Sequence, residues 1–78
     1  MAGMASIPDA GARQVDLAEA ARQLQLAAHD ARVAFDCVQL GELDRAHTHA
    51  IMARAASDAA ENVLRAALGD AAGRTDEP

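Results

Sequence analysis

The sequence predicts an all-α fold: an antiparallel two-helix hairpin that self-associates into a helical bundle, which is a four-helix bundle when it forms as a dimer. Three observations lead to this prediction. Alanine, leucine, glutamine and arginine dominate, and proline is absent from Asp9 to Leu40, a composition that favours helices. Apolar residues recur at spacings of three and four, which is the helical period. Gly41 interrupts this pattern midway along the chain and so predicts the corner between two helices.

The first helix is expected at about residues 7–40, after a disordered N-terminus at residues 1–5. Ser6 can cap this helix, and Pro8 is tolerated in its first turn. The spacing predicts an inner stripe that faces the second helix, formed by Leu17, Ala21, Leu24, Ala28, Ala31, Phe35 and Val38. Beside it runs a ridge of small residues at intervals of seven, which lets a neighbouring backbone come close: Ala20, Ala27, Ala34 and Gly41.

The turn is expected at residues 41–43. Gly41 suits the left-handed conformation in which helices often end, and Asp44 is a candidate N-cap for the second helix. The alternative is one unbroken helix through Gly41, since a glycine within a helix costs only about 1 kcal/mol relative to alanine.

The segment LGELDRA (residues 40–46), with Ala34 before it and Ala53 after it, resembles the inter-helix turn of a tetratricopeptide repeat. The resemblance covers about a third of the chain, and the large aromatic residues of that family are missing. Solenoids need about three stacked repeats, whereas this chain has room for one. The resemblance therefore implies the turn alone.

The second helix is expected at about residues 44–68, because Gly69 repeats the signal for a helix end. The hairpin then spans residues 6–69, and residues 70–78 form a polar, disordered tail. Folding back at the turn is expected to bring Ala34 near Ala50. The predicted inner stripe of this helix comprises Leu43, Ala46, Ala50, Ala53, Ser57, Ala60, Leu64 and Ala67.

Both helices carry more apolar surface than a hairpin can bury. A helix that is apolar around most of its circumference packs on more than one side. We therefore expect a second apolar side to form a protein interface, with Leu26, Val33, Cys37, Leu40, Met52 and Val63 as its residues. The expected partner is the chain itself, as a homodimer or higher oligomer, with another protein as a further candidate.

Composition restricts the function. The net charge is −5, lysine is absent, and the seven arginines are spread along the chain, so we expect neither nucleic acid nor a membrane as partner. Phe35 is the one aromatic residue, which disfavours a small-molecule pocket. We expect no enzymatic activity and no cofactor. A lone cysteine, Cys37, and the lack of a secretory signal indicate the cytoplasm.

The predicted function is a non-catalytic helical interaction module: an adaptor, an accessory subunit or an assembly factor. The alternative is a metal-binding helical bundle. Asp44 and His47 share a helical face, and Cys37 lies near them if the hairpin forms; carboxylate, imidazole and thiolate are ligands of zinc and other transition metals. A third hypothesis is a subunit of a larger hetero-complex that is unstable alone.

Overall fold

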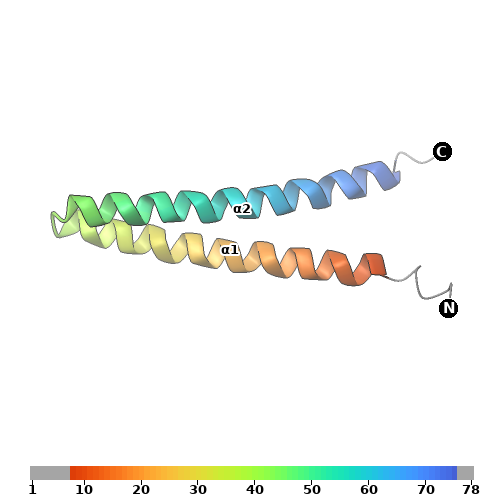
Figure 1. Ribbon diagram of the computed structural model, residues 1–78, viewed down its shortest axis with the longest axis horizontal. Helices are drawn as coiled ribbons and strands as arrows, with labels where there is room; N and C mark the ends of the chain where they lie inside the picture. Colours follow the sequence, from red (N-terminus) through yellow and green to blue (C-terminus); the bar gives the residue numbers. More distant parts are fainter. Residues whose placement is uncertain (1–7, 76–78) are drawn as a thin grey trace.

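The computed structural model describes residues 8–75, and the side chains of residues 16–70 within them. This part of the chain contains two helices, α1 (Pro8–Gln39) and α2 (Leu43–Thr75). Figure 1 shows them side by side and antiparallel, with the turn at one end and the outer ends of both helices at the other. The predicted all-α hairpin is confirmed, and the alternative of one unbroken helix is wrong.

The first helix matches its expected range of 7–40 to within one residue at each end. The second helix continues to Thr75, beyond the end expected at Leu68. Gly69 does not end it because Gly69 keeps a helical backbone. Residues 70–75 are therefore helical, whereas the other segments expected to be disordered, 1–5 and 76–78, lie outside the described residues.

The turn follows a Schellman motif. Gly41 has a φ of 76°, and its N–H donates to the carbonyl of Val38 at 3.0 Å. The N–H of Glu42 donates to the carbonyl of Cys37 at 2.8 Å. These two bonds satisfy carbonyls that the end of a helix would otherwise leave unpaired. The expectation that Gly41 adopts the left-handed conformation is confirmed.

The second helix begins one residue earlier than expected, so its cap also differs. The carbonyl of Glu42 accepts the N–H of Ala46 at 2.9 Å, which places Glu42 rather than Asp44 at the N-cap position. Asp44 lies in the first turn of α2. An acidic side chain there still stabilises the helix, because it faces the positive end of the helix dipole.

The packing face of α1 differs from the predicted inner stripe. Of that stripe, Leu17, Leu24, Phe35 and Val38 are all exposed, and so are its three alanines. The buried residues of α1 are Ala20, Ala27, Asp30 and Cys37, with Ala34 half-buried. The ridge of small residues therefore packs against α2, one position (about 100° around the helix) from the stripe that was expected to do so.

The prediction for α2 is half correct. The alanines of its predicted stripe at intervals of seven lie on the packing face, where Ala46 and Ala60 are buried and Ala53 and Ala67 half-buried. The other four members, Leu43, Ala50, Ser57 and Leu64, are exposed. Their places are taken by the residues one position earlier, Glu42, His49, Ala56 and Val63, all half-buried.

The alignment of the two helices also differs from the expected one, because residues that face each other lie closer together in the sequence. His49 contacts Asp30 across the hairpin, and Glu42 contacts Cys37 through the turn. Continuing this register places Ala34 opposite residues 45 and 46 rather than Ala50, a shift of about one helical turn. The three-residue connection, residues 40–42, produces this shift, because its Schellman motif starts the return path immediately after Gly41.

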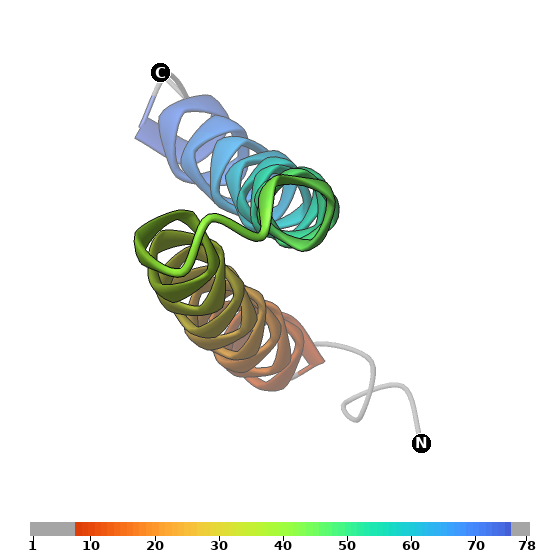
Figure 2. The same ribbon diagram turned by 90° about the vertical axis from the view of Figure 1, so that its left-hand side faces the viewer.

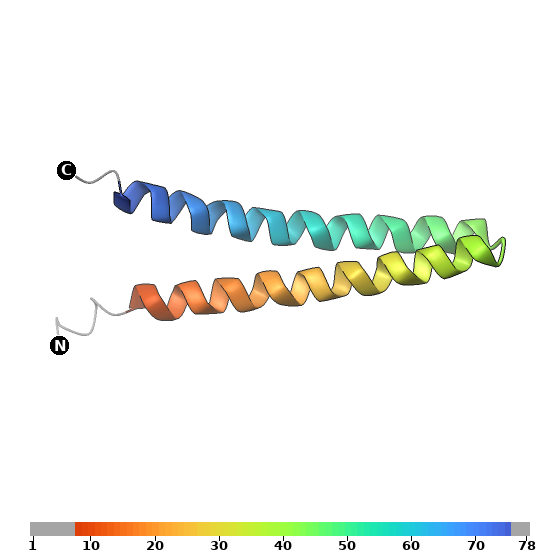
Figure 3. The same ribbon diagram turned by 180° about the vertical axis from the view of Figure 1, so that it is seen from behind.

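Viewed from its turn, the hairpin is a single layer of two helices (Figure 2). Figures 1 and 3 show the helices nearest each other at the turn and wider apart at the open end. A single layer leaves two broad faces without any covering element among the described residues. Neither described helix combines the length and apolarity that a membrane span requires.

Candidate interaction surfaces

The core of the hairpin consists of small side chains. Its buried apolar residues are Ala20, Ala27, Cys37, Ala46 and Ala60, and no large side chain is fully buried among the described residues. The large apolar side chains lie outside the core and are exposed: Leu17, Leu24, Leu26, Phe35, Val38, Leu40, Leu43, Ile51, Met52, Leu64 and Leu68. This is the reverse of an ordinary globular core, in which large aliphatic residues are the most buried.

These side chains belong largely to two broad faces. In an antiparallel pair, residues one position after the core residues lie on the same side of both helices, and residues one position before them lie on the other. We name the first the Leu24 face; its residues nearest the joint are Leu17, Leu24, Ala31 and Val38 of α1 with Leu43, Ala50, Ser57 and Leu64 of α2. Farther from the joint, the same side carries Ala21, Ala28 and Phe35 of α1 with His47, Arg54 and Glu61 of α2. The second, the Leu26 face, comprises Leu26, Val33, Leu40, Met52, Ala59 and Ala66.

The interface predicted from the sequence corresponds to the Leu26 face. Leu26, Leu40 and Met52 are 43%, 71% and 47% exposed, so they are accessible to a partner. Val33 and Val63 are half-buried, where they border this face. Cys37 is only 4% exposed, because it sits on the packing face of α1 beside the turn, and it is therefore not available to a partner of the folded hairpin.

Sequence reasoning missed the Leu24 face as a surface, because it assigned the same residues to the inner stripes. That stripe does repeat with the helical period, but it does not face the other helix as predicted. The signal that identifies the true packing face is the strict interval of seven between Ala20, Ala27 and Ala34, matched in α2 by Ala46, Ala53 and Ala60. Small residues at this interval allow the closest approach of two helices, so they exclude larger residues from the joint.

One polar contact joins the two helices. The Nδ1 atom of His49 lies 3.0 Å from Oδ1 of Asp30, and Asp30 is the one buried polar or charged residue in the described part, at 7% exposure. The contact requires a proton on Nδ1, which the charged imidazole and one neutral tautomer both carry. It is the one side-chain hydrogen bond between α1 and α2 among the described residues.

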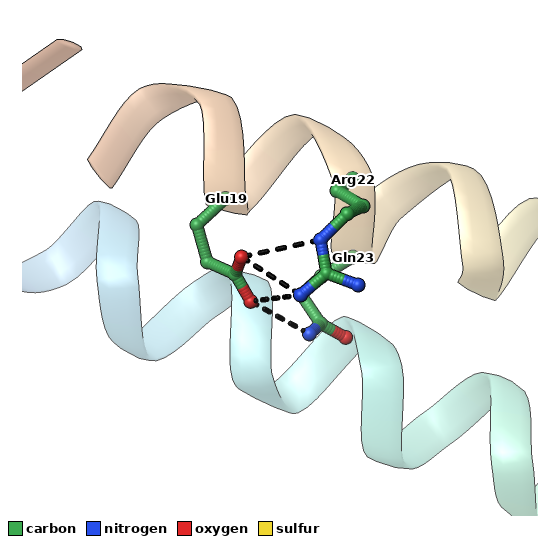
Figure 4. A network of polar contacts seen from close by, with 3 residues as sticks. All are labelled: Glu19, Arg22 and Gln23. Carbon is green, nitrogen blue, oxygen red and sulfur yellow. Dashed lines mark hydrogen bonds and ion pairs between the residues drawn. The ribbon is translucent and has the colours of Figure 1, made fainter. Parts of the chain in front are cut away.

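The remaining polar pairs run along single helices. Figure 4 shows the side chains of Arg22 and Gln23 converging on the carboxylate of Glu19, with Gln23 at 2.9 Å and Arg22 at 2.8 Å. The hydrogen bond from Gln23, followed by that from Arg22, lowers the pKa of Glu19 below its ordinary value. Such exposed pairs on one helix contribute little to stability, because water screens their charges.

The metal-binding alternative has no ligand cluster within one chain. Asp44 and His47 are exposed, whereas Cys37 is buried. Among the described residues, no group of three or more histidines, cysteines, aspartates and glutamates is gathered as a metal ion requires. The predicted set of Asp44, His47 and Cys37 is therefore not brought together by the fold.

A hollow of about 300 Å³ lies on the outer side of α2. Its lining residues are Ile51, Arg54, Ala55 and Asp58, all from one helix. A pocket for a small molecule is usually walled by several elements and encloses most of its ligand. Residues of one helix alone line this hollow, so it is an open depression for a neighbouring side chain rather than an enclosed site.

Comparison with known proteins adds no relative: no protein-family model matches the chain, and no curated protein or solved structure is significantly similar to it. The function must therefore be argued from the two broad faces themselves.

Proposed function

We propose that this protein is a non-catalytic helical interaction module, such as an adaptor, an accessory subunit or an assembly factor. It acts by packing its helices against those of another chain, most simply a second copy in a four-helix bundle. The observation that carries the proposal is the inverted distribution of apolar side chains: alanines fill the core, and the leucines, Phe35 and Met52 lie outside it.

The energy balance supports association. Covering one leucine or valine side chain contributes about 1.5 to 3 kcal/mol, while the net stability of a whole domain is about 5 to 15 kcal/mol. Leu17, Leu24 and Leu26 are each slightly less than half exposed, so covering the remainder of all three contributes about 2 to 4 kcal/mol. The alanine core cannot make up the difference, because alanine has little side-chain area to bury.

Two broad faces are available to partners. The Leu26 face, with Leu26, Val33, Leu40 and Met52, is the interface that the sequence predicts. The Leu24 face adds a second apolar surface of similar length. A hairpin that is apolar on both faces is suited to lie within a larger helical assembly, where each face is covered by other helices.

The proposal is tested by the dependence of thermal stability on protein concentration. If folding is coupled to association, mass action raises the midpoint of thermal unfolding as the concentration rises. We expect the midpoint, followed by circular dichroism at 222 nm, to increase by several degrees over an approximately hundredfold range of concentration. A midpoint that is the same at every concentration would show that the hairpin is stable as a monomer, and the proposal would fail.

A further inference from the structure

We propose that a second copy of this chain covers the Leu24 face, with the turns of the two copies at opposite ends and α1 lying along α1 of the second copy. This inference rests on the proposed function, to which it adds a face and an orientation. It follows from the charge, the side-chain sizes and the area of the Leu24 face.

The eight positions of the Leu24 face nearest the joint are uncharged, whereas the row of α2 beyond them holds His47, Arg54 and Glu61. These eight positions hold leucine, valine, alanine and serine. The equivalent rows on the opposite side of the hairpin include Glu19 and Arg45 as well as the residues of the Leu26 face. An uncompensated charge that is buried at an interface destabilises it strongly, so the Leu24 face is the better surface for a partner that covers it from end to end.

On α1, the edge of the Leu24 face brings no unpaired cation into the joint. Phe35 borders this face on α1, and the guanidinium of Arg32 lies 5.5 Å from the centre of its ring. Arg32 also pairs with Asp36 of its own helix at 3.4 Å. The charge nearest to Phe35 is thus balanced within the same chain, and Phe35 keeps an exposed apolar edge that a second copy can cover.

The predicted inner stripe of α1, which is exposed, is complementary to the same stripe of a second copy that runs in the opposite direction. A two-fold axis near Ala28 places Phe35 of one copy against Ala21 of the other, and Leu24 against Ala31. At the ends, Leu17 meets Val38. Large side chains therefore lie against small ones in the middle of the joint, the arrangement that fills a helix–helix interface without voids or clashes. Four of the seven positions pair a large side chain with a small one, namely Ala21, Leu24, Ala31 and Phe35. Ala28 meets Ala28 of the other copy at the axis.

The opposite orientation packs poorly. With both turns at the same end, Ala31 and Ala50 of one copy lie against the same two residues of the other, so four alanines meet at one level. At the open end, two copies each of Leu17 and Leu64 meet together. One level is then underfilled and another overfilled, and both conditions destabilise a packed interface.

The Leu26 face does not offer the same match. Reversing it places the carboxylate of Glu19 against Leu40 of the second copy, which would bury a charge against an aliphatic side chain. A second copy on the Leu24 face leaves Leu26, Val33 and Met52 for a further chain, in agreement with their proposed role as interface residues.

The Leu24 face is also large enough. From Leu17 to Val38 it is about 33 Å long, and two helices side by side are about 20 Å wide. Its flat area is thus about 660 Å², which lies within the roughly 600 to 1,000 Å² that each partner buries in a standard protein interface.

The face is tested with a matched pair of substitutions. Leu24 and Leu26 lie two positions apart on α1 and are 47% and 43% exposed, so Leu24→Glu and Leu26→Glu make the same chemical change in similar surroundings on opposite faces. We expect Leu24→Glu to weaken dimerisation at least about tenfold in sedimentation equilibrium, since it buries two carboxylates per dimer. Leu26→Glu should leave the dissociation constant within about threefold of the wild type, a difference below 1 kcal/mol.

The orientation is tested by the distance between spin labels on Leu40→Cys in a Cys37→Ala background, after circular dichroism and mass confirm a helical dimer. Leu40 is next to the turn and outside the Leu24 face. With turns at opposite ends, two labels lie about 36 Å apart along the helix axis; with turns at the same end, they lie within about 20 Å of each other. Pulsed electron spin resonance distinguishes these two distances.

The outcomes separate this inference from the proposed function. A long label distance together with dissociation by Leu24→Glu alone supports the inference. A dimer with a short label distance overturns the orientation, and dissociation by Leu26→Glu, alone or alongside Leu24→Glu, overturns the choice of face. Both of those results leave the proposed function intact. A wild-type monomer under all conditions overturns both.

Discussion

The contact between Asp30 and His49 is the one point at which polar side chains link the two helices in the described part of the chain. It lies within a face of alanines, and none of the buried side-chain nitrogen and oxygen atoms described lacks a hydrogen bond. A single buried polar pair in an apolar joint can specify register, because any other alignment leaves its members unpaired. The pair accounts for one defined register in a joint whose alanines alone would tolerate sliding.

This role predicts the effect of removing His49. His49→Ala leaves the Asp30 carboxylate buried without its partner, and we expect it to lower the free energy of unfolding by about 1 to 3 kcal/mol in urea denaturation at fixed protein concentration. The exposed His29 provides the control, since His29→Ala should change the stability by less than about 0.5 kcal/mol.

A double-mutant cycle distinguishes a direct contact from general packing effects. Asp30→Ala and His49→Ala should be non-additive by at least about 0.5 kcal/mol, because the second substitution removes a partner that is already missing. Additive losses would mean that the pair does not contribute as a unit.

At the scale of the helices, the two glycines near predicted helix ends behave in opposite ways. Gly41 has a positive φ and ends α1, whereas Gly69 lies within α2. A Cβ atom added to either glycine would meet nothing within 4 Å. The backbone conformation is therefore the whole difference between them.

The two positions give a matched prediction. Gly41→Ala should destabilise the hairpin by about 1 to 2 kcal/mol, because alanine is strained in the left-handed conformation. Gly69→Ala should instead stabilise it by up to about 1 kcal/mol, because alanine is the better helix former. Thermal unfolding at one concentration measures both changes. A stabilising Gly41→Ala would indicate that the turn is not formed as described.

The helices themselves were predictable from the sequence, but the side that each presents was not. Leu24 and Ala27 both belong to patterns with the helical period, and these patterns differ by about 100° around the helix. The inner stripe was predicted from its alternating spacing of three and four, which runs through Leu24. In a two-helix layer, alanines in the joint let the two backbones pack closely against each other. Leucines on the outer faces can instead be covered by another chain. The alanines therefore occupy the joint.

The polar contact within the joint was missed for the same reason. Neither Asp30 nor His49 was predicted to lie in the joint between the helices. Once the alanines at intervals of seven are taken as the packing face, Asp30 falls between Ala27 and Ala34, and His49 between Ala46 and Ala53. Their pairing then follows from the turn, whose three-residue length could not be deduced from Gly41 alone.

At the scale of the whole molecule, the hairpin has the construction of half a bundle. One layer of helices has a small core and two broad apolar faces. The proposals follow from this construction: the function lies in association, a second copy covers the Leu24 face, and the Leu26 face serves a further contact.

The most direct test of this account is the mass of the wild-type protein in solution, measured by static light scattering at micromolar concentrations. A chain of 8.1 kDa that associates as proposed should scatter as a helical species of twice that mass or more, and should dissociate only with loss of helicity as it is diluted. A fully helical species of 8.1 kDa that persists at all concentrations would contradict the account, because its leucines would then be stable in water without a partner.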